Sequence, residues 1–129
     1  MKKKVISVSI IFLSIMVVAL LVFNLKIPKP KSGFTELYLV DKLPKEAKRN
    51  QEYNFSFTIH NMENRFMSYN YSVYLKNDII NQGSVDLEHD KIAILHQNFS
   101  VTSINDVSLP IIVRLSNQNQ EIHFWVHVK

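Results

Sequence analysis

The sequence predicts an all-β domain behind one apolar N-terminal segment. Apolar residues alternate with polar residues over short stretches, turn residues separate these stretches, and no ten-residue helical pattern lies between them. About seven such stretches fall within the 97 residues from Gly33 to Lys129. This count and size are typical of an immunoglobulin-like antiparallel β-sandwich. Parallel α/β folds are disfavoured because they need a helix between successive strands.

The N-terminal segment, residues 5–25, contains no charged side chain. As a helix rising ~1.5 Å per residue it would span roughly 31 Å, the thickness of a hydrocarbon core. We therefore expect a transmembrane signal-anchor helix at 5–25 that contacts the lipid bilayer, with residues 1–4 as a cytoplasmic tail. The alternative is a cleaved signal peptide, which needs small residues at its cleavage site. The bulky residues 21–25 favour a retained anchor. Three lysines lie on each side, so the free amino terminus alone favours an inside N-terminus.

A lysine- and proline-rich stalk is expected at residues 26–33, because Pro28 and Pro30 favour an extended chain. Residues 1–31 carry six lysines and no acid, whereas residues 32–129 hold the other 9 basic residues and all 11 acids. The globular part is therefore mildly acidic. Nucleic-acid binding is not expected, because it needs the basic residues on the folded domain.

The expected strands differ in how clearly they alternate. The clearest pattern places Tyr53, Phe55, Phe57 and Ile59 on one face of a half-buried strand. Two readings of the connection after this strand, a hairpin and a crossing between two sheets, remain open. In chain order the expected strands are Thr35–Val40, Tyr53–His60, Met67–Leu75, Ile79–Val85, Lys91–Val101, Ser108–Ser116 and Glu121–Val128.

Three stretches carry a resemblance to a known family: Gly33–Val40, Phe57–Asn64 followed by Tyr69–Tyr74, and Glu121–Val128. In order, they resemble an uncharacterised, mainly archaeal family of membrane-anchored proteins. Members have an extracytoplasmic immunoglobulin-like domain of unknown function, a Phe-Thr-Glu-x-Tyr opening motif and a Trp-centred last strand. The resemblance implies that residues 34–129 lie outside the cell. It supplies no catalytic or ligand residues, and this chain has one apolar segment where longer members have several.

Composition excludes several kinds of site. The absence of cysteine removes disulfides, thiolate metal sites and cysteine nucleophiles, and two glycines are too few for a phosphate-binding loop. His123 and His127 lie ~13 Å apart along a strand, too far to bind one ion together. A metal site would need His60, His89 and His96 to converge. We expect no metal and no cofactor.

Asp86, Glu88 and Asp90 place three carboxylates at alternate positions. A calcium loop would need more oxygens and a glycine turn, and nothing marks a sugar cleft for a glycosidase pair. We expect a solvated edge or turn here and no catalytic residue.

Asn54, Asn70 and Asn98 each begin an Asn-x-Ser triplet, where chance predicts about 1.4 such triplets. All three lie opposite the aromatic face of their strands, so they are candidate glycosylation sites.

The last strand carries the only tryptophan. Alternation assigns Ile122, Phe124, Val126 and Val128 to the core. It leaves His123, Trp125 and His127 on the other face, where an exposed tryptophan would contact a partner or a sugar. The alternative is a Trp125 packed beneath a neighbouring loop or against the stalk.

Together these features predict a single-pass membrane protein with a C-terminal extracytoplasmic domain for binding or envelope assembly, without catalysis. The alternative is an accessory subunit of a larger membrane complex, and a cell-surface hydrolase is a remote alternative.

Overall fold

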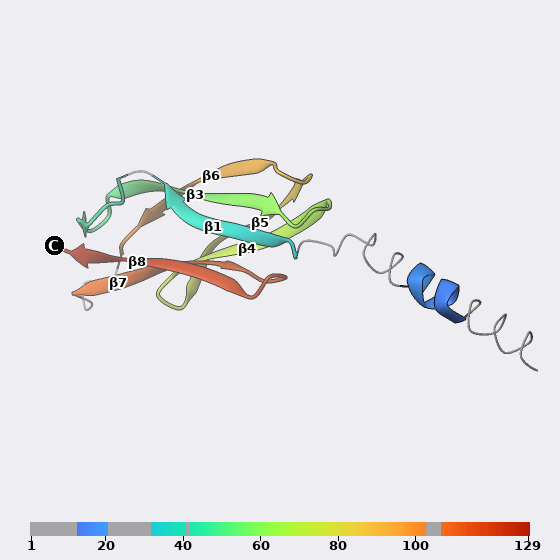
Figure 1. Ribbon diagram of the computed structural model, residues 1–129. Helices are drawn as coiled ribbons and strands as arrows, with labels where there is room; N and C mark the ends of the chain where they lie inside the picture. Colours follow the sequence, from blue (N-terminus) through green and yellow to red (C-terminus); the bar gives the residue numbers. More distant parts are fainter. Residues whose placement is uncertain (1–12, 21–31, 41, 103–106) are drawn as a thin grey trace, which may run out of the picture. The chain divides into compact units, whose positions relative to one another are not determined.

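The computed structural model describes residues 13–20, 32–40, 42–102 and 107–129 (Figure 1). Residues 1–31 and 32–129 are separate units. Residues 13–20 are helical, and among the described residues no helix has the length and apolar character needed to cross a membrane. Most of the expected anchor at 5–25 and of the stalk at 26–33, and all of the tail at 1–4, lie outside the described residues.

The domain is built from strands, as expected. In the described residues these are β1 (Phe34–Val40), β2 (Glu46–Ala47), β3 (Glu52–Met62), β4 (Met67–Leu75), β5 (Asp78–Leu87), β6 (Ile92–Ser100), β7 (Ser108–Leu115) and β8 (Gln120–Val128). All seven expected strands are confirmed, with bounds that differ by a few residues. The expectation of a half-buried strand was wrong for β3, because Ser56 and Thr58 on its other face are buried as well. The two-residue strand β2 was missed because it is too short to show any alternation.

The strands form two packed sheets (Figure 1). One sheet has the order β1-β3-β6 and the other the order β2-β8-β7-β4-β5. All neighbours are antiparallel except β2, which runs parallel to β8. Because β3 and β4 belong to different sheets, the connection between them is a crossing and not a hairpin.

Asn61 holds this crossing in place. Its side chain is fully buried, and Nδ2 donates to the carbonyl oxygens of Arg65 at 2.8 Å and Leu87 at 2.7 Å. Its Oδ1 accepts the backbone N–H of Glu63 at 2.9 Å. The buried side-chain amide of Asn61 thus forms hydrogen bonds with backbone groups at the point where the chain leaves β3.

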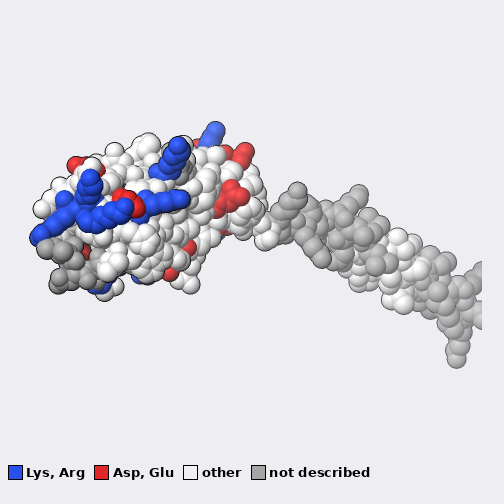
Figure 2. Space-filling model, turned by 90° about the vertical axis from the view of Figure 1, so that its left-hand side faces the viewer, with Lys and Arg blue, Asp and Glu red and all other residues white. Residues whose placement is uncertain are grey.

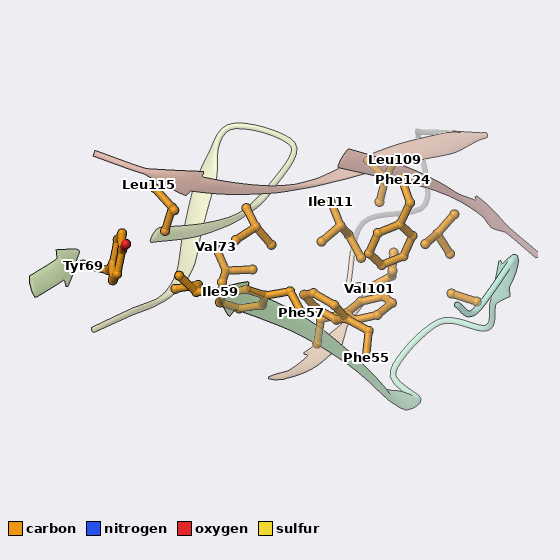
Figure 3. Packing of buried hydrophobic residues seen from close by; sticks show 14 of the residues in the cluster. Phe55, Phe57, Ile59, Tyr69, Val73, Val101, Leu109, Ile111, Leu115 and Phe124 are labelled. Atoms are coloured by element: carbon orange, nitrogen blue, oxygen red, sulfur yellow. The ribbon is translucent and has the colours of Figure 1, made fainter. Parts of the chain in front are cut away.

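Apolar rows from the two sheets meet between them (Figure 3). Phe55 and Phe57 of β3 face Ile111 of β7 and Phe124 of β8. The rings of Phe55 and Phe124 pack edge to face, with 5.2 Å between their centres. Such aromatic contacts join the sheets in a chain without a disulfide.

Candidate contact surface

Strand β8 separates its side chains as alternation predicts. Val126 is fully buried and Phe124 is 8% exposed, whereas Trp125 is 53% exposed. His123 and His127 are also exposed and lie on the face of Trp125. Trp125 is therefore not packed beneath a neighbouring loop of the described domain. It lies on the outer face of the five-stranded sheet.

The neighbouring strands complete a surface that we call the aromatic face. In the ladder Pro110 lies opposite Trp125, and Ile112 lies between His123 and Tyr74. The aromatic face consists of Tyr74, Pro110, Ile112, Arg114, His123, Trp125 and His127. Most of its side chains come from β7 and β8, which pair with each other along their length.

Arg114 has a defined position on the aromatic face. Its guanidinium lies 5.2 Å from the centre of the Tyr74 ring, and its Nη2 lies 3.0 Å from Oε2 of Glu121. A cation over an aromatic ring and beside a carboxylate loses part of its conformational freedom before any partner arrives. The aromatic face thus offers an oriented hydrogen-bond donor beside the Tyr74 ring, and the Trp125 ring further along the same face.

The histidines outside β8 do not form a metal site. Nδ1 of His96 is hydrogen-bonded to Oγ of Ser56 at 2.8 Å, and His89 lies exposed in the turn between β5 and β6. Among the described residues no group of three His, Asp or Glu side chains could hold a metal ion.

His60 belongs to a cluster that the sequence did not indicate. Its Nδ1 lies 2.7 Å from Oε2 of Glu36, and its Nε2 lies 3.1 Å from Oδ1 of Asp90. The hydrogen bond to Glu36, followed by that to Asp90, raises the pKa of His60 above its ordinary value. Because the two carboxylates lie at different ring nitrogens, the cluster is a clamp joining β1, β3 and the β5–β6 turn. The sequence holds no signal for this cluster, because the register of β1 on β3, which places Glu36 opposite His60, is set by the tertiary structure.

The acidic run lies as expected at a strand end and in a turn. Asp86 is in β5, whereas Glu88 and Asp90 follow it in an exposed turn. Asp90 has a positive φ of 61°, and its Oδ1 lies 3.1 Å from Nε2 of His60.

The three candidate glycosylation sites are all exposed. Asn54 and Asn98 lie on the outer face of the three-stranded sheet, directly opposite each other. Asn70 lies on the outer face of the other sheet, opposite Ser84. Exposure satisfies one requirement for a glycan, and occupancy stays a prediction.

Lysine and arginine side chains gather on one side of the domain (Figure 2). The segment 42–49 contributes four exposed basic residues, and β2 within it pairs with the end of β8. This pairing brings Lys129 to Glu46, with 2.6 Å between Nζ and Oε1. The charge of the domain is thus unevenly distributed, although its total is negative.

No family model matches the chain, and no curated protein does either. Solved structures do match. The crystal structure of the CARDB domain of the PF1109 protein from Pyrococcus furiosus, described in complex with di-metal ions, has a TM-score of 0.62 at 18% identity and covers 76% of this chain and 96% of that one. The solution NMR structure of the same domain has a TM-score of 0.60, at 18% identity, and covers 74% of this chain and 96% of that one.

A β-glucosidase from Listeria innocua also matches, with a TM-score of 0.63 and 17% identity, over 74% of this chain but only 16% of the enzyme. At such identities these likenesses show the fold alone. They confirm that the domain is an immunoglobulin-like β-sandwich, similar in fold to CARDB domains.

Proposed function

We propose that the chain is a single-pass membrane-anchored protein whose domain, residues 34–129, is an extracytoplasmic module for binding or envelope assembly. The uncharged run at 5–25, its lysine flanks and the family resemblance support the anchor and the orientation. The observation that carries the binding function is the half-exposed Trp125 on the aromatic face.

Trp125 suits a protein partner because its ring offers much apolar area at little cost in side-chain freedom. Tryptophan, tyrosine and arginine are the residues most enriched among those that dominate binding energy. All three types occur on the aromatic face. The partner would cover the Trp125 ring and accept hydrogen bonds from Arg114 and His123. The chemistry is non-covalent recognition.

A second candidate function is that of an accessory subunit of a larger membrane complex. Ser7 and Ser14 are seven residues apart in the sequence, a spacing that would place both on one side of an expected helix, where small residues favour close helix packing. The β-glucosidase likeness does not support a hydrolase, because it spans a small part of that enzyme.

The test is affinity purification of the tagged full chain from its native membranes in mild detergent. We expect Trp125→Ala to lower recovery of the partner at least about tenfold, as for a central contact residue. Ile94→Ala is the matched control, because Ile94 is 55% exposed but lies on the other sheet. Equal recovery with both variants would contradict the proposal. A stoichiometric membrane partner that Trp125→Ala retains would favour the accessory subunit.

A further inference from the structure

One side of the sandwich is open between β1 and β8. β1 is the edge of its sheet, and β2 covers β8 only at its end, where Glu46 pairs with His127. In the part of the chain that the structure describes, the first half of β8 has no strand on that side. Figure 1 shows β1 and β8 next to each other along this opening.

The backbone of β1 directs groups that pair with no described strand into this opening. The carbonyl oxygen of Thr35 accepts a hydrogen bond from Nε2 of Gln120 at 3.1 Å, so it points away from β3. In an antiparallel strand every second residue directs its N–H and C=O to the same side. Leu37 and Leu39 therefore also direct both groups to the open edge, where no described strand pairs with them.

This edge lacks the features that usually protect an edge strand. β1 reads Phe34-Thr-Glu-Leu-Tyr-Leu-Val40, without proline or lysine, and its register on β3 is continuous. Natural edge strands are commonly short, bulged or charged, because an unprotected edge pairs with other chains. A seven-residue regular edge with one charge is suited to accept another strand.

A groove of about 650 Å³ runs beside the edge. Its lining comes from Thr35–Tyr38 of β1 and Gln120–Ile122 of β8. Leu37 and Ile122 also pack on the core, so they form an apolar inner wall. Oε1 of Gln120 is buried and has no hydrogen-bond partner among the described residues. A buried hydrogen-bond acceptor without a donor is unusual, so an occupant that donates a hydrogen bond to Oε1 of Gln120 would be favoured.

The charge of the groove restricts its occupant. Glu36 and Glu121 line it, and no lysine or arginine does, whereas the segment 42–49 of the same domain carries three lysines and one arginine. His60 beside Glu36 and Arg114 beside Glu121 balance part of this negative charge from outside the lining. Two β1 edges from two copies would bring their acidic linings together, which disfavours a second copy. A basic occupant fits better.

We propose that β1 accepts an extended segment of a partner protein, which adds as a fourth strand to the β1-β3-β6 sheet. Only a polypeptide offers N–H and C=O groups at the repeat of the unpaired groups of β1, about 6.7 Å for two residues. Its inward side chains are apolar and pack on Leu37 and Ile122. Its outward side chains include lysine or arginine beside Glu36 and Glu121.

The test uses the full chain in detergent micelles and a capped heptapeptide of alternating valine and lysine. We expect the peptide to slow hydrogen exchange of the Leu37 and Leu39 amides at least about tenfold. Two further peptides carry N-methyl groups on alternate backbone amides. One is methylated at its odd-numbered residues and the other at its even-numbered residues. Methylation of one set should abolish binding, whereas methylation of the other should not, because only one set faces β1.

Three results would overturn the proposal: unchanged exchange of the Leu37 and Leu39 amides, equal binding of both methylated peptides, and protection that appears without peptide as the chain is concentrated. The last result would assign the edge to a second copy.

A variant tests the same edge from the protein side. Leu37→Pro removes an N–H that faces the opening and leaves the ladder to β3 intact, so it should weaken peptide binding about tenfold. Leu37→Val, which keeps the N–H, is the matched control. If Leu37→Pro fails to fold, the methylated peptides still decide, because they leave the chain unchanged. Trp125→Ala should not alter peptide binding, which separates this site from the aromatic face.

Discussion

Asn54 and Asn98 are direct partners in the β3–β6 ladder, and both side chains are exposed on the outer face of the three-stranded sheet. Their Cβ atoms are therefore about 5 Å apart, as in any directly opposed pair. Two branched glycans cannot start side by side at this spacing without crowding.

We therefore expect a glycosylating host to modify at most one of these two asparagines in any one molecule. Intact mass spectrometry of the full chain measures this directly. Asn54→Gln and Asn98→Gln should each leave the mass of one glycan at the pair, and Asn70→Gln is the control for the distant site. A species with glycans on both Asn54 and Asn98 would contradict the prediction.

Trp125→Ala should change the free energy of unfolding by less than about 1 kcal/mol, because the side chain is half exposed. Phe124→Ala, one residue earlier, should cost about 3–5 kcal/mol, because that ring is buried against Phe55. Urea unfolding of the two variants measures the difference. A large loss with Trp125→Ala would assign the tryptophan to the fold and remove its role in binding.

The His60 clamp should make stability depend on pH. The pKa of His60 in the folded domain is raised above its ordinary value by the hydrogen bonds to Glu36 and Asp90, so folding favours protonated His60. The stabilisation is complete below the unfolded pKa and is lost as the pH rises through the folded pKa. The urea midpoint should therefore fall as the pH rises from 6.5. His60→Asn should flatten this dependence, whereas His89→Asn, in an exposed turn, should not. An equal slope in the His60→Asn variant would refute the role of the clamp.

Gly33→Ala should destabilise the domain by about 1–3 kcal/mol, because a Cβ there would lie against the backbone of Glu63, 2.6 Å from its carbonyl oxygen. Gly83→Ala should cost less. Its Cβ would lie 2.6 Å from the hydroxyl oxygen of Tyr71, which belongs to a side chain and not to the backbone. Thermal unfolding of both variants compares them. A smaller effect at Gly33 than at Gly83 would contradict this packing argument.

Protease added to intact cells or spheroplasts should remove a tag at Lys129 if the domain is extracytoplasmic. The expectation rests on the lysine flanks, the free amino terminus and the family resemblance. A cytoplasmic protein with the same tag is the control for membrane integrity. Protection of the Lys129 tag until the membrane is lysed would reverse the proposed orientation.

The sequence by itself determined where seven of the eight described strands lie and which face of β8 is buried. Alternation with a period of two is a local property of an extended chain, so Phe124 and Trp125 could be assigned to opposite faces without any knowledge of their neighbours. The same alternation assigned Asn54, Asn70 and Asn98 to exposed faces.

Only the tertiary structure decided which strands are neighbours, because pairing depends on contacts between residues far apart in the chain. It made the β3–β4 connection a crossing, placed Asn54 opposite Asn98 and joined Glu36, His60 and Asp90, which come from three separate segments. The open edge of β1 is likewise invisible in the sequence. A strand becomes an edge only when the rest of the chain leaves one of its sides unpaired.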